Sequence, residues 1–471
     1  MFKVLILAAG KGKRMKSEIP KVLHRLLNRP MISWVIETAR KLHPDEMGVV
    51  LGYKADEVQK VLSEDIKVFI QPELLGTGHA VMCAEDFLNF DGDLLILYGD
   101  VPNIKAETLE KMLSKHREES NSMTILTAFF ENPTGYGRIL RNESGKIVSI
   151  VEEADADEET KKIREINSGI YVFKATHLLN GLKYLRNDNK QREYYLTDLV
   201  KIFLESGQKV ETFLVDNPRE IAGVNDRIQL AKVEKLLRLE INYSHMLNGV
   251  TIIDPESTFI DPEVKIENDT VIYPSTFIYG NTTIGKKCEI GPFTVIKDCK
   301  IGDNVRIVQS NCEDSEIFSG TSVGPFSRLR PGTVLKENTR IGNFVEVKNS
   351  ILESGVKANH LSYIGDSEVG ENTNVGAGTI TCNYDGYKKH RTRIGKNVFI
   401  GSNSALVAPL KVGDGAIVGA GSVITEDVPD DSLGIARSRQ INKEGWARKW
   451  RMKKEKEVQG LNPEKEDAKK K

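Results

Sequence analysis

The segment IGKKCEIGPFTV (residues 284–295) places a branched aliphatic residue at every sixth position, at Ile284 and Ile290 and next at Ile296. An α-helix turns once in 3.6 residues and would scatter such positions around its circumference. A coil of three short parallel strands stacks each aliphatic side chain on the one a full turn below. Gly, Asn and Asp between these positions suit corners with unusual backbone angles. The segment predicts a parallel β-helix, because ordinary antiparallel strands would alternate at every second residue.

The six-residue period runs, with shifts, through much of the second half of the chain. It is kept at Ile260, Ile266, Ile272, Ile278, Ile284, Ile290 and Ile296, at Val323, Leu329, Leu335, Ile341 and Val347, and at Ile394, Ile400, Leu406, Val412, Val418 and Ile424. This repeat resembles that of the hexapeptide-repeat proteins. The resemblance implies a left-handed parallel β-helix.

Composition limits the classes of protein to which the chain can belong. With 66 Lys and Arg against 67 Asp and Glu, the net charge of −1 argues against nucleic-acid binding through phosphate neutralisation. The five cysteines form no CxxC pair and follow no secretory signal, so we expect reduced thiols in a cytoplasmic protein. No apolar stretch is long enough to span a bilayer, so we expect no integral membrane contact.

Changes of pattern divide the chain into four predicted parts. Apolar strand-like segments alternate with helix-like segments in the first part, which predicts an α/β domain with a Rossmann-like, mostly parallel sheet. A segment without Pro or Gly follows, with apolar residues at near-helical spacing, and predicts a long linker helix. The predicted parts are the α/β domain at 1–226, the linker helix at 227–248, the β-helix domain at 249–437 and a charged tail at 438–471.

A glycine-rich basic loop follows the first predicted strand, in LAAGKGKRMKSEIPKVL (7–23). Gly10 and Gly12 allow backbone N–H groups to approach an anion, and Lys11, Lys13, Arg14 and Lys21 surround it with positive charge. The loop matches neither GxxxxGK[ST] nor GxGxxG, and such a loop alone is as often a solvated turn as a nucleotide site.

The loop resembles the signature of the sugar-nucleotide pyrophosphorylases, which carry G-x-G-x-R-M with a following Pro-Lys. Further pieces of this family's pattern follow in order: QPELLGTGHA (71–80), LYGDVP (97–102), GYGRI (135–139), VEE (151–153), INSGIY (166–171) and GVND (223–226). The segment around Gln71 with Tyr98, Gly99 and Asp100 is the uridyl-type variant. Joined to the β-helix, the pattern resembles the bifunctional bacterial enzymes that combine a uridyltransferase with an acetyltransferase.

The resemblance implies a site for UTP and N-acetylglucosamine-1-phosphate, the precursors of UDP-N-acetylglucosamine. It implies that Arg14 and Lys21 stabilise phosphate charge, and that Asp100 and Asn225 hold Mg²⁺ through the hard oxygen atoms this ion prefers. The implied contacts to UDP-N-acetylglucosamine are Leu7, Ala8, Ala9, Gly10, Lys21, Gln71, Gly76, Thr77, Tyr98, Gly99, Asp100, Gly137, Glu152, Asn167 and Asn225.

Each of these polar residues also has a structural interpretation. Asp100 at a strand end can cap the next helix, and Glu152 lies in an acidic stretch. Asn225 can serve as the N-cap of the linker helix.

The β-helix by itself names no activity, because such coils also serve only to assemble subunits. KANHLSYIGD (357–366) places His360 within the coil, and CNYDGYKKHR (382–391) breaks the six-residue period and must project as a loop. Transfer of an acetyl group to an amino sugar requires a neutral amine, and histidine is the natural base near neutral pH. A lone histidine in a coil is more often an ordinary surface or core residue.

The resemblance to the bifunctional enzymes implies that His360 is the general base of acetyl transfer. It implies contacts to glucosamine-1-phosphate from Arg330, Lys348, Tyr363 and Asn374, and contacts to acetyl-coenzyme A from Ala377, Asn383, Tyr384, Ser402, Ala420 and Arg437. It also implies a homotrimer with acetyl-transfer sites shared between subunits. The alternative is a pyrophosphorylase whose β-helix only regulates or assembles it.

Overall fold

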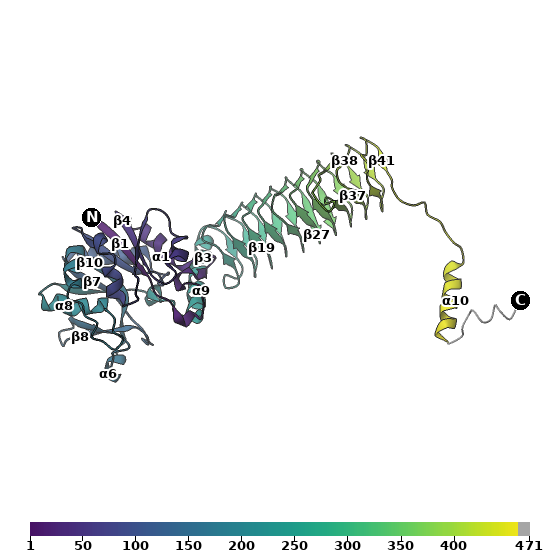
Figure 1. Ribbon diagram of the computed structural model, residues 1–471. Coiled ribbons are helices and arrows are strands. Elements are labelled where there is room, and N and C mark those ends of the chain that lie inside the picture. Colours follow the sequence, from purple (N-terminus) through teal and green to yellow (C-terminus); the bar gives the residue numbers. More distant parts are fainter. Residues whose placement is uncertain (460–471) are drawn as a thin grey trace. The chain divides into compact units, whose positions relative to one another are not determined.

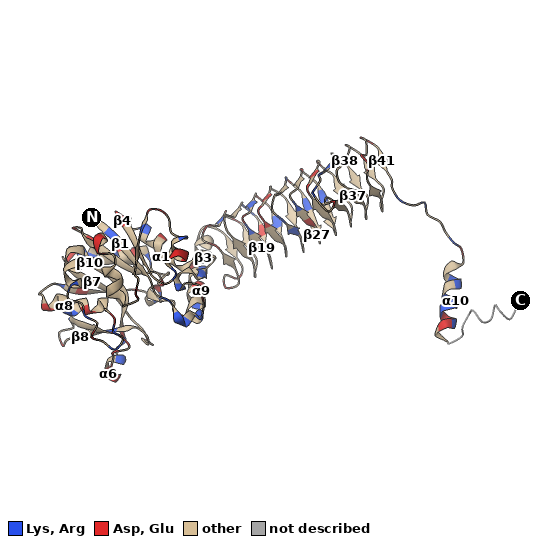
Figure 2. Ribbon diagram, viewed as in Figure 1, with Lys and Arg blue, Asp and Glu red and all other residues tan. Residues whose placement is uncertain are grey.

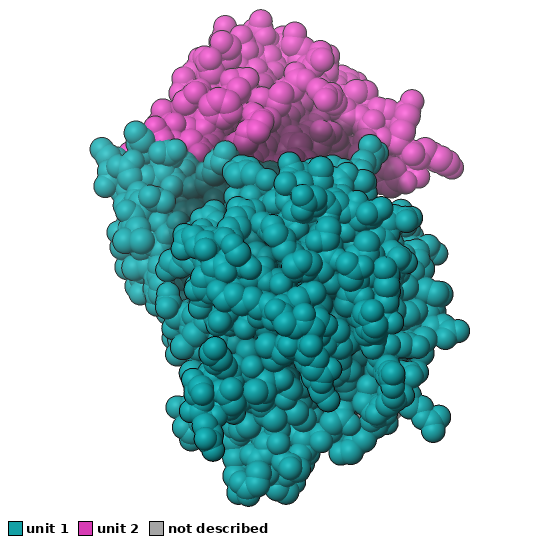
Figure 3. Space-filling view, turned by 90° about the vertical axis from the view of Figure 1, so that its left-hand side faces the viewer, with its two compact units in different colours: residues 1–298 teal, residues 299–471 magenta. Residues whose placement is uncertain are grey.

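The computed structural model describes residues 1–459 (Figure 1). The chain divides into two compact units, one of residues 1–298 and one that begins at residue 299 (Figure 3). Among the residues described, no helix has both the length and the apolar composition needed to cross a membrane. The five cysteines form no disulfide.

The α/β part of the first unit is built on a nine-stranded sheet whose main path runs β11-β7-β10-β6-β1-β4-β5. All neighbours on this path are parallel except β10, which is antiparallel to β6 and β7. The strands are β1 (Phe2–Ala8), β4 (Glu46–Leu51), β5 (Ile66–Ile70), β6 (Asp93–Tyr98), β7 (Met123–Phe129), β8 (Gly137–Arg141), β9 (Ile147–Val151), β10 (Glu165–Lys174) and β11 (Val210–Leu214). The predicted mostly parallel sheet is confirmed.

Both faces of this sheet are buried, which explains the continuous apolar sequence of β1. Val4 and Ile6 belong to one core cluster, whereas Leu5 and Leu7 belong to another on the opposite face. The main covering helices are α1 (Met31–Arg40), α3 (Thr77–Met82), α4 (Glu85–Leu88), α5 (Ala106–Glu118), α7 (Ala175–Leu182) and α8 (Leu199–Glu205). Short elements complete this part: β2 (Arg25–Leu26), β3 (Arg29–Pro30), α2 (Ala55–Gln59) and α6 (Glu158–Lys161).

The predicted linker helix is α9 (Arg227–Leu247). Its N-cap is Asp226, whose side chain accepts a hydrogen bond of 2.8 Å from the Gln229 N–H. The suggestion that Asn225 caps this helix was therefore wrong. The buried side of α9 includes Val233 and Leu237, whereas Ile228 in its first turn is 68% exposed.

The β-helix begins within the first unit, where strands pair in register with those one coil further on: Ile260 lies opposite Ile278, and Ile278 opposite Ile296. Every aliphatic position of the predicted six-residue period is buried. The strands here are β12 (Thr251–Ile252), β13 (Phe259–Ile260), β14 (Lys265–Ile266), β15 (Val271–Ile272), β16 (Phe277–Tyr279), β17 (Thr283–Ile284), β18 (Glu289–Ile290) and β19 (Val295–Lys297).

In the second unit the coils form three parallel sheets. Each sheet is named after the strand that one particular coil contributes to it, which is β30, β31 or β32. The β30 sheet contains β21 (Arg306–Ile307), β24 (Ser322–Val323), β27 (Arg340–Asn343), β30 (Lys357–His360), β33 (Asn374–Val375), β36 (Phe399–Ile400), β39 (Ile417–Val418) and β41 (Leu433–Gly434). The β31 sheet contains β22 (Asn311–Glu313), β25 (Arg328–Leu329), β28 (Glu346–Lys348), β31 (Tyr363–Gly365), β34 (Ile380–Cys382), β37 (Ala405–Val407) and β40 (Val423–Ile424). The β32 sheet contains β20 (Lys300–Ile301), β23 (Ser315–Ile317), β26 (Thr333–Leu335), β29 (Ile351–Leu352), β32 (Ser367–Val369), β35 (Thr392–Ile394) and β38 (Leu410–Val412). The predicted β-helix is confirmed.

The chain after the coils forms α10 (Trp446–Val458), which contains six Lys and Arg residues and two Glu residues. Figure 2 shows both kinds of charge on this helix. Trp446 and Trp450 stack there with ring centroids 6.3 Å apart, which agrees with the short helix predicted for the tail. Residues 460–471 of the predicted tail lie outside the described residues.

Candidate active sites

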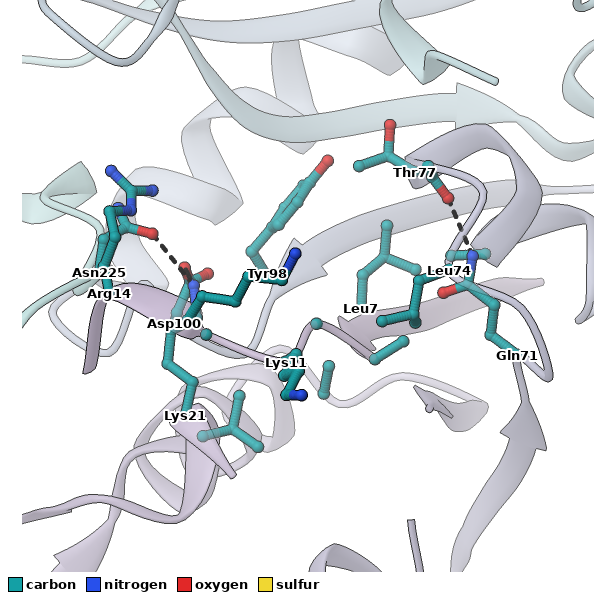
Figure 4. A pocket seen from close by; sticks show the side chains of 18 of the residues that line it. Leu7, Lys11, Arg14, Lys21, Gln71, Leu74, Thr77, Tyr98, Asp100 and Asn225 are labelled. Atoms are coloured by element: carbon teal, nitrogen blue, oxygen red, sulfur yellow. Dashed lines mark hydrogen bonds and ion pairs between the residues drawn. The ribbon is translucent and has the colours of Figure 1, made fainter. Parts of the chain in front are cut away.

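A cavity of about 610 Å³ opens at the carboxyl ends of β1 and β6 (Figure 4). Ligands of parallel α/β sheets bind at this edge. The predicted residues that line it are Leu7, Ala8, Ala9, Gly10, Arg14, Lys21, Gln71, Gly76, Thr77, Tyr98, Asp100 and Asn225. Gly99 is not part of the lining, but its N–H donates 3.0 Å to the carbonyl of Leu7 and so joins the two strand ends.

The glycine-rich loop folds tightly enough to carry Lys21 back over the sheet. Gly12 has φ +64°, and a Cβ there would lie 2.6 Å from the Cβ of Lys21. Only glycine therefore allows this approach of the two backbone segments. Arg14 and Lys13 follow in the short 3₁₀ turn Lys13–Met15 and face the same cavity.

Asp100 and Asn225 converge on one positive charge, the ammonium group of Lys21 (Figure 4). Lys21 Nζ forms a salt bridge with Asp100 and donates a hydrogen bond of 3.2 Å to Asn225 Oδ1. The Val224 N–H donates 2.9 Å to the Asp100 carbonyl, which holds the two segments together. Two oxygen atoms directed at one cation fit the ligand preference of Mg²⁺. Among residues 1–459 no cluster of three or more His, Cys, Asp or Glu residues could hold a metal, so water and phosphate would supply the other ligands of an ion here.

The opposite end of the cavity is formed by Gln71, Gly76 and Thr77. The buried Gln71 side chain donates 3.0 Å to the carbonyl of Gly76 and lies 3.1 Å from His79 Nδ1. Gly76 has φ +99°, and a Cβ there would meet the Tyr194 carbonyl oxygen at 2.7 Å. Thr77 Oγ1 accepts 3.1 Å from the Leu196 N–H. This end thus presents a fixed amide and backbone groups, which can read a nucleobase edge by hydrogen bonding.

Gly137, Glu152 and Asn167 form a separate group beside this cavity. Gly137 pairs with Asn167 across β8 and β10, and a Cβ at Gly137 would lie 3.4 Å from Glu152 Oε2. Asn167 donates 2.7 Å to the Tyr171 hydroxyl, and the Thr197 hydroxyl donates 3.1 Å to Glu152. Burial raises the pKa of Glu152 above its ordinary value.

Several residues that line the first cavity were not assigned to the site from the sequence. Lys11 and Lys13 were noted only as charges near the loop, and Leu74 and Glu193 gave no signal at all. Glu193 approaches from a distant segment, where its burial raises the pKa of its carboxyl. Lys11 Nζ lies 5.2 Å from the centroid of the Tyr53 ring.

In the second unit, His360 heads a column of residues at one corner of the coil. His360, Ala377, Ser402 and Ala420 each lie two residues after the buried residue of a β30-sheet strand, one coil apart. Backbone hydrogen bonds connect successive coils at this corner. The Gly378 N–H donates to the carbonyl of His360, and the Asn403 N–H donates to the carbonyl of Ala377. Arg437 Nη1 donates 3.0 Å to the carbonyl of Ala420 at the far end. His360, Ser402 and Ala420 are exposed and Ala377 is half-buried, so the column lies at the surface of the coil.

The residues expected to bind glucosamine-1-phosphate lie on two sheets that meet at the corner after His360. Arg330, Lys348 and Tyr363 lie on successive coils of the β31 sheet, whereas Asn374 lies on the β30 sheet. Arg330 donates 2.9 Å to Glu346 Oε1, so Glu346 orients it. Arg391, at the end of the projecting loop, forms a 2.6 Å ion pair with Glu368.

The predicted projecting loop follows β34 and returns at β35. The Asp385 carboxylate accepts 2.8 Å hydrogen bonds from the N–H groups of Tyr387 and Lys388 and lies 2.6 Å from His390 Nε2. These donors, the Lys388 N–H first, lower the pKa of Asp385 to about 2. Asn383 is buried at the base of the loop, and Tyr384 is exposed.

Lys389 and Asp366 were missed by the sequence analysis. Lys389 of the projecting loop lies so close to Lys348 that its ammonium group lowers the pKa of Lys348. Asp366 accepts hydrogen bonds from the side chains of Asn349 and Asn383. Neither contact follows from sequence spacing, because each joins residues brought together only by the stacking of coils.

Known proteins match both halves of the chain. Residues 3–218 match the nucleotidyl transferase family, residues 263–298 the bacterial transferase hexapeptide (six repeats) family, and residues 391–426 the hexapeptide repeat of succinyl-transferase.

The chain is also similar over nearly its full length to curated proteins named bifunctional protein GlmU. That of Fervidobacterium nodosum is 56% identical over 95% of this chain and 98% of its own length. The protein of Thermotoga maritima is 54% identical over 95% and 99%, and that of Caldanaerobacter subterraneus is 52% identical over 94% and 96%. The chain therefore belongs to the GlmU family, whose members are bifunctional enzymes that combine a uridyltransferase with an acetyltransferase.

Proposed function

We propose that this enzyme makes UDP-N-acetylglucosamine from glucosamine-1-phosphate in two steps on two separate sites. Acetyl-coenzyme A first acetylates the amino sugar at the His360 site. N-acetylglucosamine-1-phosphate then reacts with UTP in the cavity of the α/β domain, with release of pyrophosphate. The observation that carries this proposal is the presence on one chain of both a cation-rich cavity at a parallel sheet edge and a histidine at the head of the corner column.

In the uridyl-transfer step, an oxygen of the sugar phosphate attacks the α-phosphorus of UTP, and pyrophosphate leaves in line. The chain contributes mainly positioning and charge. Lys11, Lys13, Arg14 and Lys21 offset the charge of the triphosphate and the leaving pyrophosphate. Asp100 and Asn225 would hold Mg²⁺, which when bound would supply positive charge against that of the phosphates.

Two groups of residues divide recognition of the substrates between them. Gln71, Gly76 and Thr77 bind the uracil, and Gly137, Glu152 and Asn167 bind the N-acetylhexosamine. The fixed orientation of Gln71, whose amide is already bonded to the Gly76 carbonyl, supports the first assignment. The close approach of Gly137 to Glu152 and Asn167 supports the second.

In the acetyl-transfer step, His360 removes a proton from the amine as its nitrogen attacks the thioester carbonyl. The new C–N bond forms, the C–S bond breaks, and the proton passes to the leaving sulfur of coenzyme A. The outer face of the β31 sheet lies between the corner column and the projecting loop, and Arg330, Lys348 and Tyr363 on this face bind glucosamine-1-phosphate. Coenzyme A lies along Ala377, Ser402 and Ala420, with Arg437, Asn383 and Tyr384 as further contacts.

The active form we propose is a homotrimer. Phe326, Phe344 and Leu361 form an apolar stripe at the corner of three successive coils and are 52%, 59% and 63% exposed. The rings of Phe326 and Phe344 stack with centroids 5.4 Å apart. Exposed apolar stripes of this kind favour burial against another chain. Leu361 directly follows His360, so burial of the stripe by a second copy would also enclose the acetyl-transfer site.

The division into domains at 1–226, 227–248, 249–437 and 438–471 and a cytoplasmic location are parts of the same proposal. The division into domains is supported by helix α9, which spans Arg227–Leu247 between the α/β part and the coils. The cytoplasmic location is supported by the five cysteines, which form no disulfide.

The test compares wild type with His360→Ala in two assays: thiol release from acetyl-coenzyme A with glucosamine-1-phosphate, and pyrophosphate release from UTP with N-acetylglucosamine-1-phosphate. We expect the substitution to abolish thiol release and to leave pyrophosphate release unchanged. If the wild type releases pyrophosphate but never thiol, the alternative of a monofunctional enzyme with an assembling β-helix is correct. His43→Ala is the control, because His43 is exposed and does not line the cavity of the α/β domain.

A further inference from the structure

The tip of the hairpin formed by β2 and β3 contacts the first coil of the β-helix, which contains β12, β13 and β14 (Figure 1). Asn28 at this tip has φ +60°, and its side-chain amide donates to both carboxylate oxygens of Asp261, at 3.1 and 3.2 Å. Asp261 directly follows Ile260 of β13 and is 3% exposed. Its Oδ2 also accepts 3.0 Å from the Gly280 N–H of the next coil. This carboxylate therefore connects the α/β part to two coils within the first compact unit.

A second contact beside it is more exposed. Arg29, the next residue of the hairpin, forms a 2.5 Å ion pair with Glu263, and the two side chains are 23% and 40% exposed. Ion pairs at the surface are screened by water and contribute little to stability. Burial raises the pKa of Asp261, whereas the hydrogen bonds that it accepts from Gly280 and Asn28 lower it, so both donors stabilise the ionised carboxylate. Removal of a donor from a buried carboxylate is costly, so Asp261 is the main attachment of the hairpin to the coil.

The hairpin continues directly from the segment that carries Lys21. The 3₁₀ turn Lys21–Leu23 ends at His24, whose N–H donates 3.2 Å to the carbonyl of Lys21. The carbonyl of His24 in turn accepts 2.9 Å from the N–H of Met31, where the hairpin meets α1. A displacement of the hairpin would therefore be transmitted through these hydrogen bonds to Lys21.

The hairpin also packs against the segment that carries the second proposed metal ligand. Leu26 of β2 is buried in one cluster with Val224, the residue before Asn225. His24 at the base of the hairpin is 5% exposed, and its Nδ1 lies 3.2 Å from Nη1 of Arg227 in the first turn of α9. The hairpin thus contacts both of the segments whose side chains meet at the edge of the sheet.

Asp298 occupies the same corner of the β-helix two coils after Asp261. Its Oδ1 accepts 2.9 Å from the N–H of Asn281 in the coil before it, much as Asp261 accepts from Gly280. Among the described residues, the Asp298 carboxylate makes its hydrogen bond within the β-helix, so the additional bond to a hairpin is particular to Asp261.

We infer that Asp261, a residue of the β-helix, is a positioning residue for uridyl transfer, which fixes the tip of the β2–β3 hairpin and through it the orientation of Lys21 towards Asp100 and the bound phosphates. Asp261 itself does not line the cavity. The first coils are then a working part of the uridyltransferase, in agreement with a compact unit that extends to residue 298. The inference rests on the proposed uridyl-transfer function and adds to it a role for the β-helix.

The decisive experiment exchanges the two side chains in the full-length protein. Asn28→Asp alone places a second carboxylate against Asp261 and replaces two attractive contacts by repulsion. Asn28→Asp combined with Asp261→Asn restores one amide and one carboxylate, and the amide introduced at position 261 keeps an oxygen for the Gly280 N–H. Asn and Asp both tolerate the positive φ of position 28, so the exchange adds no backbone strain.

Two further variants complete the design. Asp298→Asn is the matched control, because it makes the same chemical change at the same corner of the coil, away from the hairpin. Asn28→Gly removes the donor without a new charge and retains the positive φ, so it gives the same test if Asn28→Asp does not fold.

We expect Asn28→Asp and Asn28→Gly to lower kcat for pyrophosphate release about tenfold, because a small displacement of Lys21 weakens its contact with the phosphates. The exchanged pair should recover most of the wild-type kcat. The KM for N-acetylglucosamine-1-phosphate should stay within about twofold of wild type, because the residues proposed to bind the sugar lie on other elements. Thiol release should be unchanged in every variant, and Asp298→Asn should match wild type in both assays.

The kinetics are measured well below the melting temperature of each variant, so that stability and catalysis are separated. Wild-type kcat in Asn28→Gly or Asn28→Asp would overturn the inference, as would a loss that the exchanged pair does not recover. A lower melting temperature with unchanged kcat would assign the contact to stability alone and would also overturn it. A wild-type enzyme that releases no pyrophosphate would instead overturn the proposed uridyl transfer itself.

Discussion

Lys21 and Asp100 form a salt bridge at the edge of the sheet, with each side chain only 15% exposed. The same ammonium group donates to Asn225. The lysine proposed to stabilise phosphate is thus bonded to both residues proposed to hold Mg²⁺, and it occupies the position of a cation between them.

This pairing predicts that Lys21 competes with a divalent cation when no nucleotide is bound. Lys21→Met should bind Mn²⁺ about fivefold more tightly than wild type, since displacement of a partly buried ion pair costs about 1 kcal/mol. Titration calorimetry or Mn²⁺ electron paramagnetic resonance measures this directly. Lys13→Met is the control, because Lys13 lines the same cavity without the contact to Asp100. Equal or weaker Mn²⁺ binding in Lys21→Met would show that the ammonium group does not exclude the metal.

Substitution of Gly76 should damage the uracil end of the cavity. In Gly76→Ala the methyl group would lie 2.7 Å from the Tyr194 carbonyl in a backbone with φ +99°, so the segment must move and Gln71 loses its fixed partner. We expect the KM for UTP to rise about tenfold and the free energy of unfolding to fall by about 1–3 kcal/mol. Gly145→Ala shares the positive φ but meets nothing within 4 Å, so it separates backbone strain from the clash. Equal effects of the two changes on KM would refute the argument.

His116 should make the α/β domain less stable in mild acid. Burial lowers its pKa from 6.5 to about 4 in the folded protein, so between these values the unfolded chain binds more protons. The free energy of unfolding therefore falls as the pH drops from about 6.5 towards 4, by at most about 3 kcal/mol from this residue. Asp93 nearby has a lowered pKa and contributes in the same direction at lower pH.

Thermal unfolding between pH 4 and 7 measures this effect. His116→Gln should show a shallower loss of stability over that range than wild type, whereas substitution of the exposed His43 by Gln should leave the slope unchanged. A wild-type slope in His116→Gln would assign the acid sensitivity to other groups.

Arg437 should affect coenzyme A and not the sugar. Its guanidinium group reaches the Ala420 carbonyl at the far end of the column from His360. Arg437→Ala should raise the KM for acetyl-coenzyme A about tenfold, with the KM for glucosamine-1-phosphate unchanged, as expected for the loss of one charged contact. The same substitution at Arg439 serves as a control, and a change in both KM values would contradict the assignment.

The apolar stripe should control assembly. Phe344→Glu places a charge in the middle of Phe326, Phe344 and Leu361 and should convert a trimer into monomers in light scattering, with loss of thiol release. Pyrophosphate release should persist. Tyr184→Glu, at a position 70% exposed in the α/β domain, should leave the assembly intact. A Phe344→Glu protein that remains trimeric would exclude this stripe as the interface.

The sequence was sufficient for features that depend on local spacing. The burial of a residue such as Ile296 could be predicted from the six-residue period of the sequence. The loop at 382–391 could be predicted because the segment breaks that period. The role of Asn225 was misjudged because the start of a helix depends on which of two adjacent residues adopts the capping conformation. Lys389, Asp366 and Glu193 could not be found in this way, because their neighbours come from other coils or distant segments.

Successive residues of the corner column from His360 to Ala420 are separated by one coil each, so their spacing is constant. Adjacent strands lie about 4.8 Å apart, so three steps from His360 to Ala420 span about 14 Å. The distance along the column between His360 and Arg437 can therefore change only by the gain or loss of a whole coil, which is about 4.8 Å. In the complex proposed here, the number of coils therefore sets the length of coenzyme A that fits between the histidine and the arginine.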